Sequence, residues 1–140
     1  MTANVAQVFL TDEEWDTTLR CAHAALRPGG HLVFETRDPQ RQAWRGWNRE
    51  DSARRADIPG VGSVESWVEV TNVSGQLVSF RGTWVFEEDG AVLISDSTLR
   101  FRRRHEVADS LLTAGFAVAE IRDAPDRPGR ELVFVAARVT

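Results

Sequence analysis

Apolar residues at helical spacing dominate the first thirty positions. The stripe that would face a core contains Trp15, Leu19, Ala22 and Leu26. Thr11 precedes the stripe, and Glu14 lies three residues after Thr11. This spacing is typical of a capping box. Pro28, followed by two glycines, cannot continue the pattern. The sequence therefore predicts a capped helix that ends before Pro28.

A short apolar run at residues 31–36 comes directly after this helix. Its centre, Leu32-Val33-Phe34, shows no polar alternation, which favours a strand covered on both faces of a parallel α/β sheet. The polar, arginine-rich residues 40–62 predict a short helix or ordered loop, followed by an irregular connector.

The period changes to two between residues 64 and 101. The predicted strands are Val64–Val73, Leu77–Glu87 and Ala91–Phe101. Turn residues separate them, at 74–76 and 89–90, so we expect a three-strand antiparallel meander. After it, helical spacing resumes until Gly115, and apolar strands are predicted at 116–121 and 131–139.

With 140 residues, the chain has room for one domain, and this order of elements indicates an α/β fold. Within the single domain 1–140 we expect three segments. They are an αβ unit with its connector at 1–62, the inserted meander at 63–102, and the terminal helix with two strands at 103–140.

Charge and composition exclude several classes of function. The chain contains no lysine, which excludes a Schiff-base lysine and a phosphate-loop lysine. Its net charge of -4 disfavours binding to nucleic acid. No apolar run approaches the roughly 20 residues that span a bilayer, and no secretory leader pattern opens the chain. We therefore expect no nucleic-acid or membrane partner.

Cysteine and histidine usage narrows the chemistry further. A single cysteine, Cys21, excludes an internal disulfide framework and a cysteine-based zinc site, and we expect it to be a buried thiol in a cytoplasmic protein. The three histidines, His23, His31 and His105, lack the spacing of metal ligands, so no metal site is predicted.

Candidate binding residues follow the predicted strand 31–36. Arg37 lies at its carboxyl end, where open α/β sheets bind ligands, so it either holds an anionic or carbonyl group of a substrate or pairs with Asp38 or Glu35 at the surface. Trp44 and Trp47 either cover a flat substrate or pack against the sheet. A basic cluster (Arg100, Arg102, Arg103, Arg104 and His105) is expected to be a solvated strand end running into a helix.

The order of these segments resembles the C-terminal half of class I S-adenosylmethionine-dependent methyltransferases. The resemblance rests on Asn4–Phe9, the capped helix, Leu26–Gly30, the strand ending in Phe34–Pro39, Leu99–Arg102, Ala114–Phe116 and Glu131–Ala136. It implies a partial Rossmann-like methyltransferase sheet, made of the last strands and helices, with the meander as the family's substrate-side insertion.

The resemblance also implies a cofactor, a substrate class and positions for the site. The implied cofactor is S-adenosylmethionine, and the implied substrate is a small-molecule methyl acceptor. By position, Asn4 and Val5 would lie beside the methionine end of the cofactor. Arg37, Trp44 and Trp47 would lie near the substrate, with Glu35 as the candidate catalytic base. The family's glycine-rich loop has no counterpart here, so the resemblance implies a truncated protein or one that needs a partner.

Two further hypotheses follow from the sequence. The strand at 31–36 would have an open edge without the family's earlier strands, so we expect it to pair with a second copy of the chain or with a complementing N-terminal half. The alternatives to a methyltransferase are a small α+β ligand-binding cone and a non-catalytic dimerisation module. The cavity of such a cone would be lined by Trp67, Phe80, Trp84 and Phe86.

Overall fold

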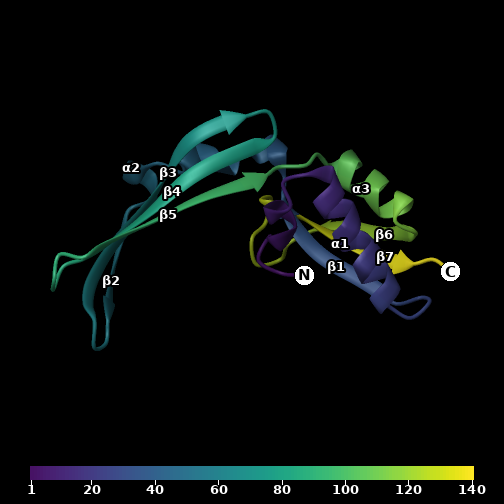
Figure 1. The fold of residues 1–140 in the computed structure, drawn as a ribbon, viewed down its shortest axis with the longest axis horizontal. Coiled ribbons are helices and arrows are strands. Elements are labelled where there is room, and N and C mark those ends of the chain that lie inside the picture. Colours follow the sequence, from purple (N-terminus) through teal and green to yellow (C-terminus); the bar gives the residue numbers. More distant parts are fainter. The chain divides into compact units, whose positions relative to one another are not determined.

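A computed structural model describes all 140 residues, and the chain divides into two compact units. The first unit comprises Met1–Gln42 and Leu99–Thr140, so both termini belong to it, and the second comprises Ala43–Thr98 (Figure 1). The single-domain organisation expected from the sequence stays a prediction. No helix is long and apolar enough to cross a membrane.

The first unit is a three-stranded antiparallel sheet with two helices. Its elements are η1 (Val5–Val8) and η2 (Pro39–Arg41), both 3-10 helices, α1 (Asp12–Ala25), β1 (His31–Arg37), α3 (Arg104–Thr113), β6 (Phe116–Asp123) and β7 (Glu131–Arg138). The strand order is β1-β7-β6. The sequence therefore predicted α1, α3 and the last two strands correctly, to within one or two residues at most ends.

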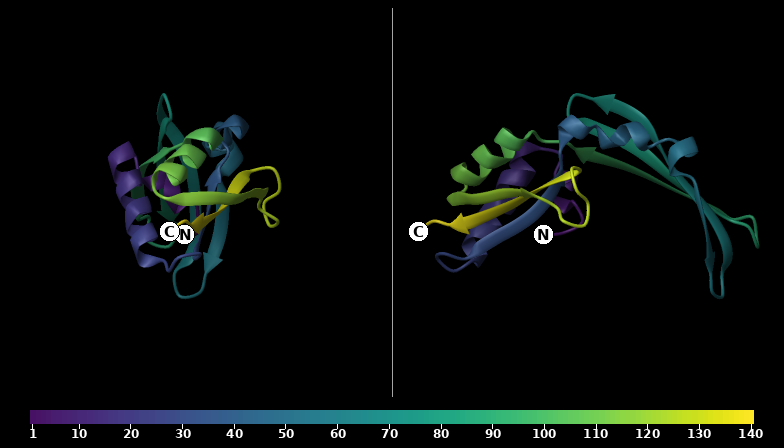
Figure 2. Two further views of the ribbon diagram at one scale, coloured as in Figure 1. Left: turned by 90° about the vertical axis from the view of Figure 1, so that its right-hand side faces the viewer. Right: turned by 180° about the vertical axis from the view of Figure 1, so that it is seen from behind.

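The core of the first unit lies on one face of this sheet, where both helices pack (Figure 2). The buried residues of this core are Ala6, Trp15, Leu19, Leu32, Phe34, Val107, Leu111, Phe116, Phe134 and Ala136. The rings of Phe34 and Phe134, which are paired across β1 and β7, stack with centroids 5.3 Å apart. Trp15 packs edge-on against Phe34 and donates a hydrogen bond from Nε1 to Ser110 Oγ, which joins α1 to α3.

The prediction that β1 is covered on both faces is wrong. Leu32, Phe34 and Thr36 are buried, but Val33 between them is 43% exposed. The strand's one neighbour, β7, runs antiparallel to it. An apolar residue on the open face hides the alternation that normally identifies a strand with one covered face.

Helix α1 begins as its sequence predicts. The Thr11 hydroxyl accepts a hydrogen bond from Glu14 N, and the Glu14 carboxylate accepts one from Thr11 N, so both halves of the capping box are present. Cys21, however, is exposed on this helix, and the expectation of a buried thiol is wrong. The apolar stripe of α1 lies on another side, at Trp15 and Leu19.

The second unit is a four-stranded antiparallel sheet, not a three-strand meander. Its elements are η3 (Ala43–Gly46), α2 (Arg49–Ser52), β2 (Arg54–Ile58), β3 (Gly62–Ser74), β4 (Leu77–Phe86) and β5 (Val92–Arg100), whose last two residues belong to the first unit. The order is β2-β3-β4-β5. The three predicted strands are confirmed, and Gly75 and Gly90 have the positive φ that their turns require. The sequence missed β2 because all five of its residues are exposed, which leaves no hydrophobic pattern.

Truncation of Phe34 tests the one-sided core of the first unit. Phe34→Ala should lower the free energy of unfolding by about 3–5 kcal/mol, because the buried ring contacts both Trp15 and Phe134. Val33→Ala, at the next position on the open face, should cost less than about 1 kcal/mol. Urea denaturation followed by circular dichroism measures both values. Equal losses would mean that the open face of β1 is covered in solution.

Candidate functional site

Polar side chains converge where β1 ends and β7 begins. The strand register places Arg37 opposite Glu131. Asn4 and Gln7, from the segment before α1, fill the same region with exposed fractions of only 3% and 1%. Buried polar groups must be hydrogen-bonded to be tolerated, so their partners define how this cluster is built.

Asn4 and Glu131 form the buried centre of the cluster. The Asn4 side-chain nitrogen donates to Glu131 Oε1 at 2.9 Å, which fixes the orientation of the amide because a carboxylate only accepts. Arg127 pairs with the same carboxylate oxygen at 3.3 Å. The other oxygens, Asn4 Oδ1 and Glu131 Oε2, are buried without a donor. The centre therefore holds two acceptors that could take hydrogen bonds from a donor group.

Gln7 holds Arg37 in place. Its side-chain oxygen accepts hydrogen bonds from Arg37 Nη1 at 3.0 Å and Arg37 N at 3.4 Å, while its side-chain nitrogen donates to the Arg100 carbonyl at 3.4 Å. Burial lowers the pKa of Arg37, and the charge of Glu131 acts in the opposite direction. The guanidinium is thus a fixed and partly desolvated cation at the end of β1.

Glu35 completes the cluster from β1. Its Oε1 accepts a long hydrogen bond, 3.4 Å, from the backbone nitrogen of Asn4. Asn4 itself has a left-handed backbone, with φ 56° and ψ 26°, which asparagine tolerates better than most residues. This turn lets the segment before α1 present both the main chain and the side chain of Asn4 to the end of the sheet.

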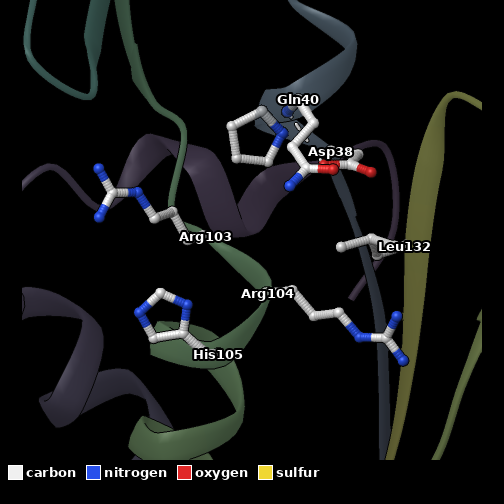
Figure 3. Close-up of a pocket in the computed structure, with 7 residues that line it drawn as sticks. Asp38, Gln40, Arg103, Arg104, His105 and Leu132 are labelled. Carbon is white, nitrogen blue, oxygen red and sulfur yellow. Dashed lines mark hydrogen bonds between the residues drawn. The ribbon is translucent and has the colours of Figure 1, made fainter.

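A surface pocket of about 530 Å³ opens beside the cluster (Figure 3). Its lining residues are Asp38, Pro39, Gln40, Arg103, Arg104, His105 and Leu132. Asp38 and Gln40 enter from one side, and the side chains of Arg103 and Arg104 diverge from the start of α3 on the other. A second pocket, of about 200 Å³, shares Asp38, Arg104 and Leu132 with the first and is also lined by Glu131, so the two pockets adjoin and the smaller one borders the buried cluster.

Only part of the basic cluster is solvated, although the sequence predicts a solvated strand end for all five residues. Arg100 pairs with Asp12 at 2.9 Å, and Arg102 is 5% exposed. Arg102 donates to the Thr11 carbonyl at 3.0 Å and lies over the Trp15 ring, and burial lowers its pKa to about 10. These two arginines therefore hold the start of α1. Arg103, Arg104 and His105 are the exposed members, and they line the larger pocket.

The structure brings together three of the residues that the sequence singled out, Asn4, Glu35 and Arg37. Val5, the next residue after Asn4, begins η1 and is 36% exposed. Trp44 and Trp47 belong to the second unit, where Trp47 packs edge-on against Phe80 with ring centroids 4.8 Å apart. A role for either tryptophan in substrate binding stays a prediction.

Sequence reasoning missed Gln7 and Glu131. Gln7 lies on a 3-10 helix, an element that leaves no strong pattern in the sequence. The sequence predicts Glu131 only as the first residue of an apolar strand. A carboxylate at the start of a strand that is otherwise buried was the available signal. No group of three or more His, Cys, Asp or Glu side chains has the arrangement needed to hold a metal ion.

Comparisons of the sequence and of the fold gave different results. No protein-family model matches the sequence, and no curated protein matches it either. The fold, in contrast, matches solved structures of methyltransferases. An S-adenosylmethionine-dependent methyltransferase from Clostridium acetobutylicum has a TM-score of 0.74 at 9% identity, and the match covers 99% of this chain and 56% of that one.

Two further matches are proteins described as acting on sugars. CalS10, an amino pentose methyltransferase from Micromonospora echinaspora, has a TM-score of 0.72 at 19% identity, covering 99% of this chain and 57% of that one. The sugar N-methyltransferase KedS8 from Streptoalloteichus sp. has a TM-score of 0.71 at 17% identity, covering 99% of this chain and 54% of that one.

These matches confirm the predicted fold. The chain has the fold of the C-terminal half of S-adenosylmethionine-dependent methyltransferases, with the antiparallel sheet included, because the match extends over 99% of its residues. The chain spans little more than half the length of those proteins, 54–57%. At identities of 9–19%, the likeness is one of fold alone.

A double-mutant cycle tests the buried pair at the centre of the site. Asn4→Gly keeps the left-handed backbone and removes only the amide, so it should cost about 1–3 kcal/mol by leaving the buried Glu131 carboxylate with one partner fewer. In a Glu131→Ala background the same change should cost clearly less. Urea denaturation of the four proteins gives the coupling energy. Additive losses would contradict the hydrogen bond between these side chains.

Proposed function

We propose that this chain is the substrate-side portion of an S-adenosylmethionine-dependent methyltransferase that acts on a small molecule. The fold match over nearly the whole chain carries the proposal. A polar cluster at the carboxyl end of β1 supports it, because open α/β sheets bind ligands at this position. A cytoplasmic location is part of the proposal and rests on the single cysteine.

In this proposal a complementing N-terminal half completes the cofactor site by pairing a strand with β1. Support comes from the edge of that strand, which has β7 on one side and no strand on the other. The Met1 amino group donates to the Val33 carbonyl at 2.7 Å, so one backbone carbonyl of β1 already accepts a hydrogen bond from a residue outside the sheet. Free N–H and C=O groups along such an edge readily accept another strand.

Asn4 and Val5 are the proposed cofactor-binding residues. Asn4 Oδ1 is a buried acceptor without a donor, and an ammonium group such as that of the methionine moiety supplies donors. The exposed Val5 side chain offers apolar contact next to it. These two residues fit one end of the cofactor, which, when bound, supplies an activated methyl group.

On the substrate side, Arg37 is the proposed anchor for an anionic or carbonyl group of the acceptor. Gln7 already fixes its guanidinium, so little side-chain freedom is lost when a ligand binds. Trp44 and Trp47 are proposed to lie near the acceptor, and Glu35 is the proposed base. Rate enhancement rests mainly on positioning the nucleophile and excluding water. An amino pentose and a sugar, the substrates named for CalS10 and KedS8, belong to the proposed class of small polar acceptors.

Isothermal titration with S-adenosylmethionine and with S-adenosylhomocysteine tests the proposal. The chain alone should give no heat at micromolar concentrations, because the glycine-rich loop of the family is not among its 140 residues. The product of the reading frame extended upstream of Met1, or the chain mixed with that upstream segment, should bind both ligands. Micromolar binding by the chain alone would contradict an incomplete site, and no binding by either form would contradict the methyltransferase proposal.

The role of Asn4 can be tested in the extended protein. Asn4→Gly should weaken S-adenosylhomocysteine binding by about tenfold or more, since a hydrogen bond to a charged group contributes roughly 1.5–3 kcal/mol. Val8→Ala is the matched control, because Val8 lies in the 3-10 helix that Asn4 caps and is 50% exposed. Titration calorimetry at a temperature where both variants stay folded gives the two dissociation constants. An unchanged constant for Asn4→Gly would exclude Asn4 from the cofactor site.

A further inference from the structure

A pocket of about 270 Å³ lies on the four-stranded sheet of the second unit. Its lining residues are Ser52, Arg54, Ser66, Trp67, Val68 and Trp84. All six belong to the second unit, and none of them takes part in the polar cluster or in the proposed cofactor site. The chemistry of this pocket is therefore deduced from its own lining.

Three of these residues form one row across the sheet. The strand register pairs Arg54 of β2 with Ser66 of β3, and Ser66 with Trp84 of β4. Because directly opposite residues of antiparallel strands project from the same face, a guanidinium, a hydroxyl and an indole ring follow one another along the row. Neighbouring strands are about 4.8 Å apart, so the row extends over about 10 Å. This length suits a small molecule with two fused rings and one substituent.

The Trp84 ring lies against the backbone of Gly82, two residues before it on the same face of β4. A Cβ atom at position 82 would lie only 2.7 Å from ring atom Cη2 and 3.0 Å from Cζ3, so the indole occupies the space that a side chain would need. Val68, opposite Gly82 on β3, lines the pocket as well. The Trp84 ring is 38% exposed, so it offers a ligand a flat apolar surface held against the strand.

Arg54 is the only charged residue in the lining of the pocket. Nearby, Arg49 pairs with Glu65, and Arg55 pairs with Glu87. Arg54 itself is exposed and pairs with no carboxylate of the protein. A guanidinium without a counter-ion favours an anionic ligand, and its planar fork matches the two oxygens of a carboxylate.

We propose that this pocket binds a planar aromatic ring that carries a carboxylate. The ring packs against Trp84 and Val68, and the carboxylate pairs with the Arg54 guanidinium. The Ser66 hydroxyl lies between them in the row as a further donor. A ring without a charge leaves the guanidinium unpaired, and a charge without a ring leaves the indole in water. Only a ligand with both groups uses the whole row.

This binding goes beyond the proposed function and does not depend on it. It needs no cofactor and uses groups of one unit only, so the chain alone is sufficient for the test. A failure of the methyltransferase proposal would leave the lining of the pocket unchanged. A failure of this inference would equally leave the proposed cofactor site unchanged.

NMR titration of the isotope-labelled chain with 2-naphthoate tests the inference. This two-ring carboxylate should bind with a dissociation constant of about 1 mM or lower, the range expected of a ligand of its size. The neutral 2-naphthamide should bind at least about tenfold more weakly, because it cannot form a bidentate ion pair with Arg54. The largest shift should occur at the indole N–H of Trp84, identified by its absence from the spectrum of Trp84→Leu. No binding at millimolar concentrations, equal affinities for the two ligands, or shifts confined to other tryptophans would overturn the inference.

Arg54→Gln tests the charged end of the row. It should weaken 2-naphthoate binding at least about tenfold and remove the preference over the amide, because the ion pair is lost. Arg45→Gln is the matched control, since Arg45 is an exposed arginine of the same unit outside the pocket, and it should leave the dissociation constant unchanged. An unchanged constant for Arg54→Gln would contradict the proposal.

Trp84→Leu tests the aromatic end. Leucine keeps the position apolar but removes the flat surface, so 2-naphthoate should bind about tenfold more weakly. Val73→Ala is the control, because Val73 is 49% exposed on β3 and lies outside the pocket. The substituted positions are exposed, so the fold should be retained, and circular dichroism checks the strand content. Full affinity in Trp84→Leu would exclude stacking on this ring.

Discussion

The stacked rings of Phe34 and Phe134 fix the register of β1 against β7, and the polar cluster depends on that register. Three residues further along β1, Arg37 lies opposite Glu131, and the antiparallel pairing leaves no freedom to shift one side chain without the other. A slip by one residue would move Phe34 out of the core and carry Arg37 to the other face. Hydrophobic packing in the middle of the sheet thus positions charged groups at its end.

The same cluster combines a rigid frame with unsatisfied acceptors. Gln7 accepts a hydrogen bond from Arg37, and the Asn4 amide donates to one oxygen of Glu131. Two buried oxygens nevertheless lack a donor, which is costly unless a ligand or a neighbouring segment supplies one. The cluster lies at the end of β1, a strand with a neighbour on one side only. The unsatisfied acceptors and an open strand edge thus occur in the same part of the first unit.

Local sequence signals predicted the elements well but the environment of β1 and of the site poorly. The Thr11–Glu14 capping box fixed the start of α1, and period-two alternation identified β3, β4 and β5, since both signals depend on nearby residues. The exposed strand β2 left no pattern, and the apolar Val33 on an open face disguised the one-sided burial of β1. Arg37 could be selected because it follows a recognisable strand, whereas Asn4 and Glu35 were selected through the resemblance to methyltransferases. The pairing of Glu131 with Asn4 could not be predicted, because the two residues lie 127 positions apart.

The Met1 amino group affects how this protein can be modified for study. It donates to the Val33 carbonyl, so residues joined in front of it would start beside the edge of β1. A purification tag placed there would compete with any natural strand for the same hydrogen bonds. The last residue, Thr140, is exposed and follows the final strand, which makes the carboxyl end the safer point of attachment.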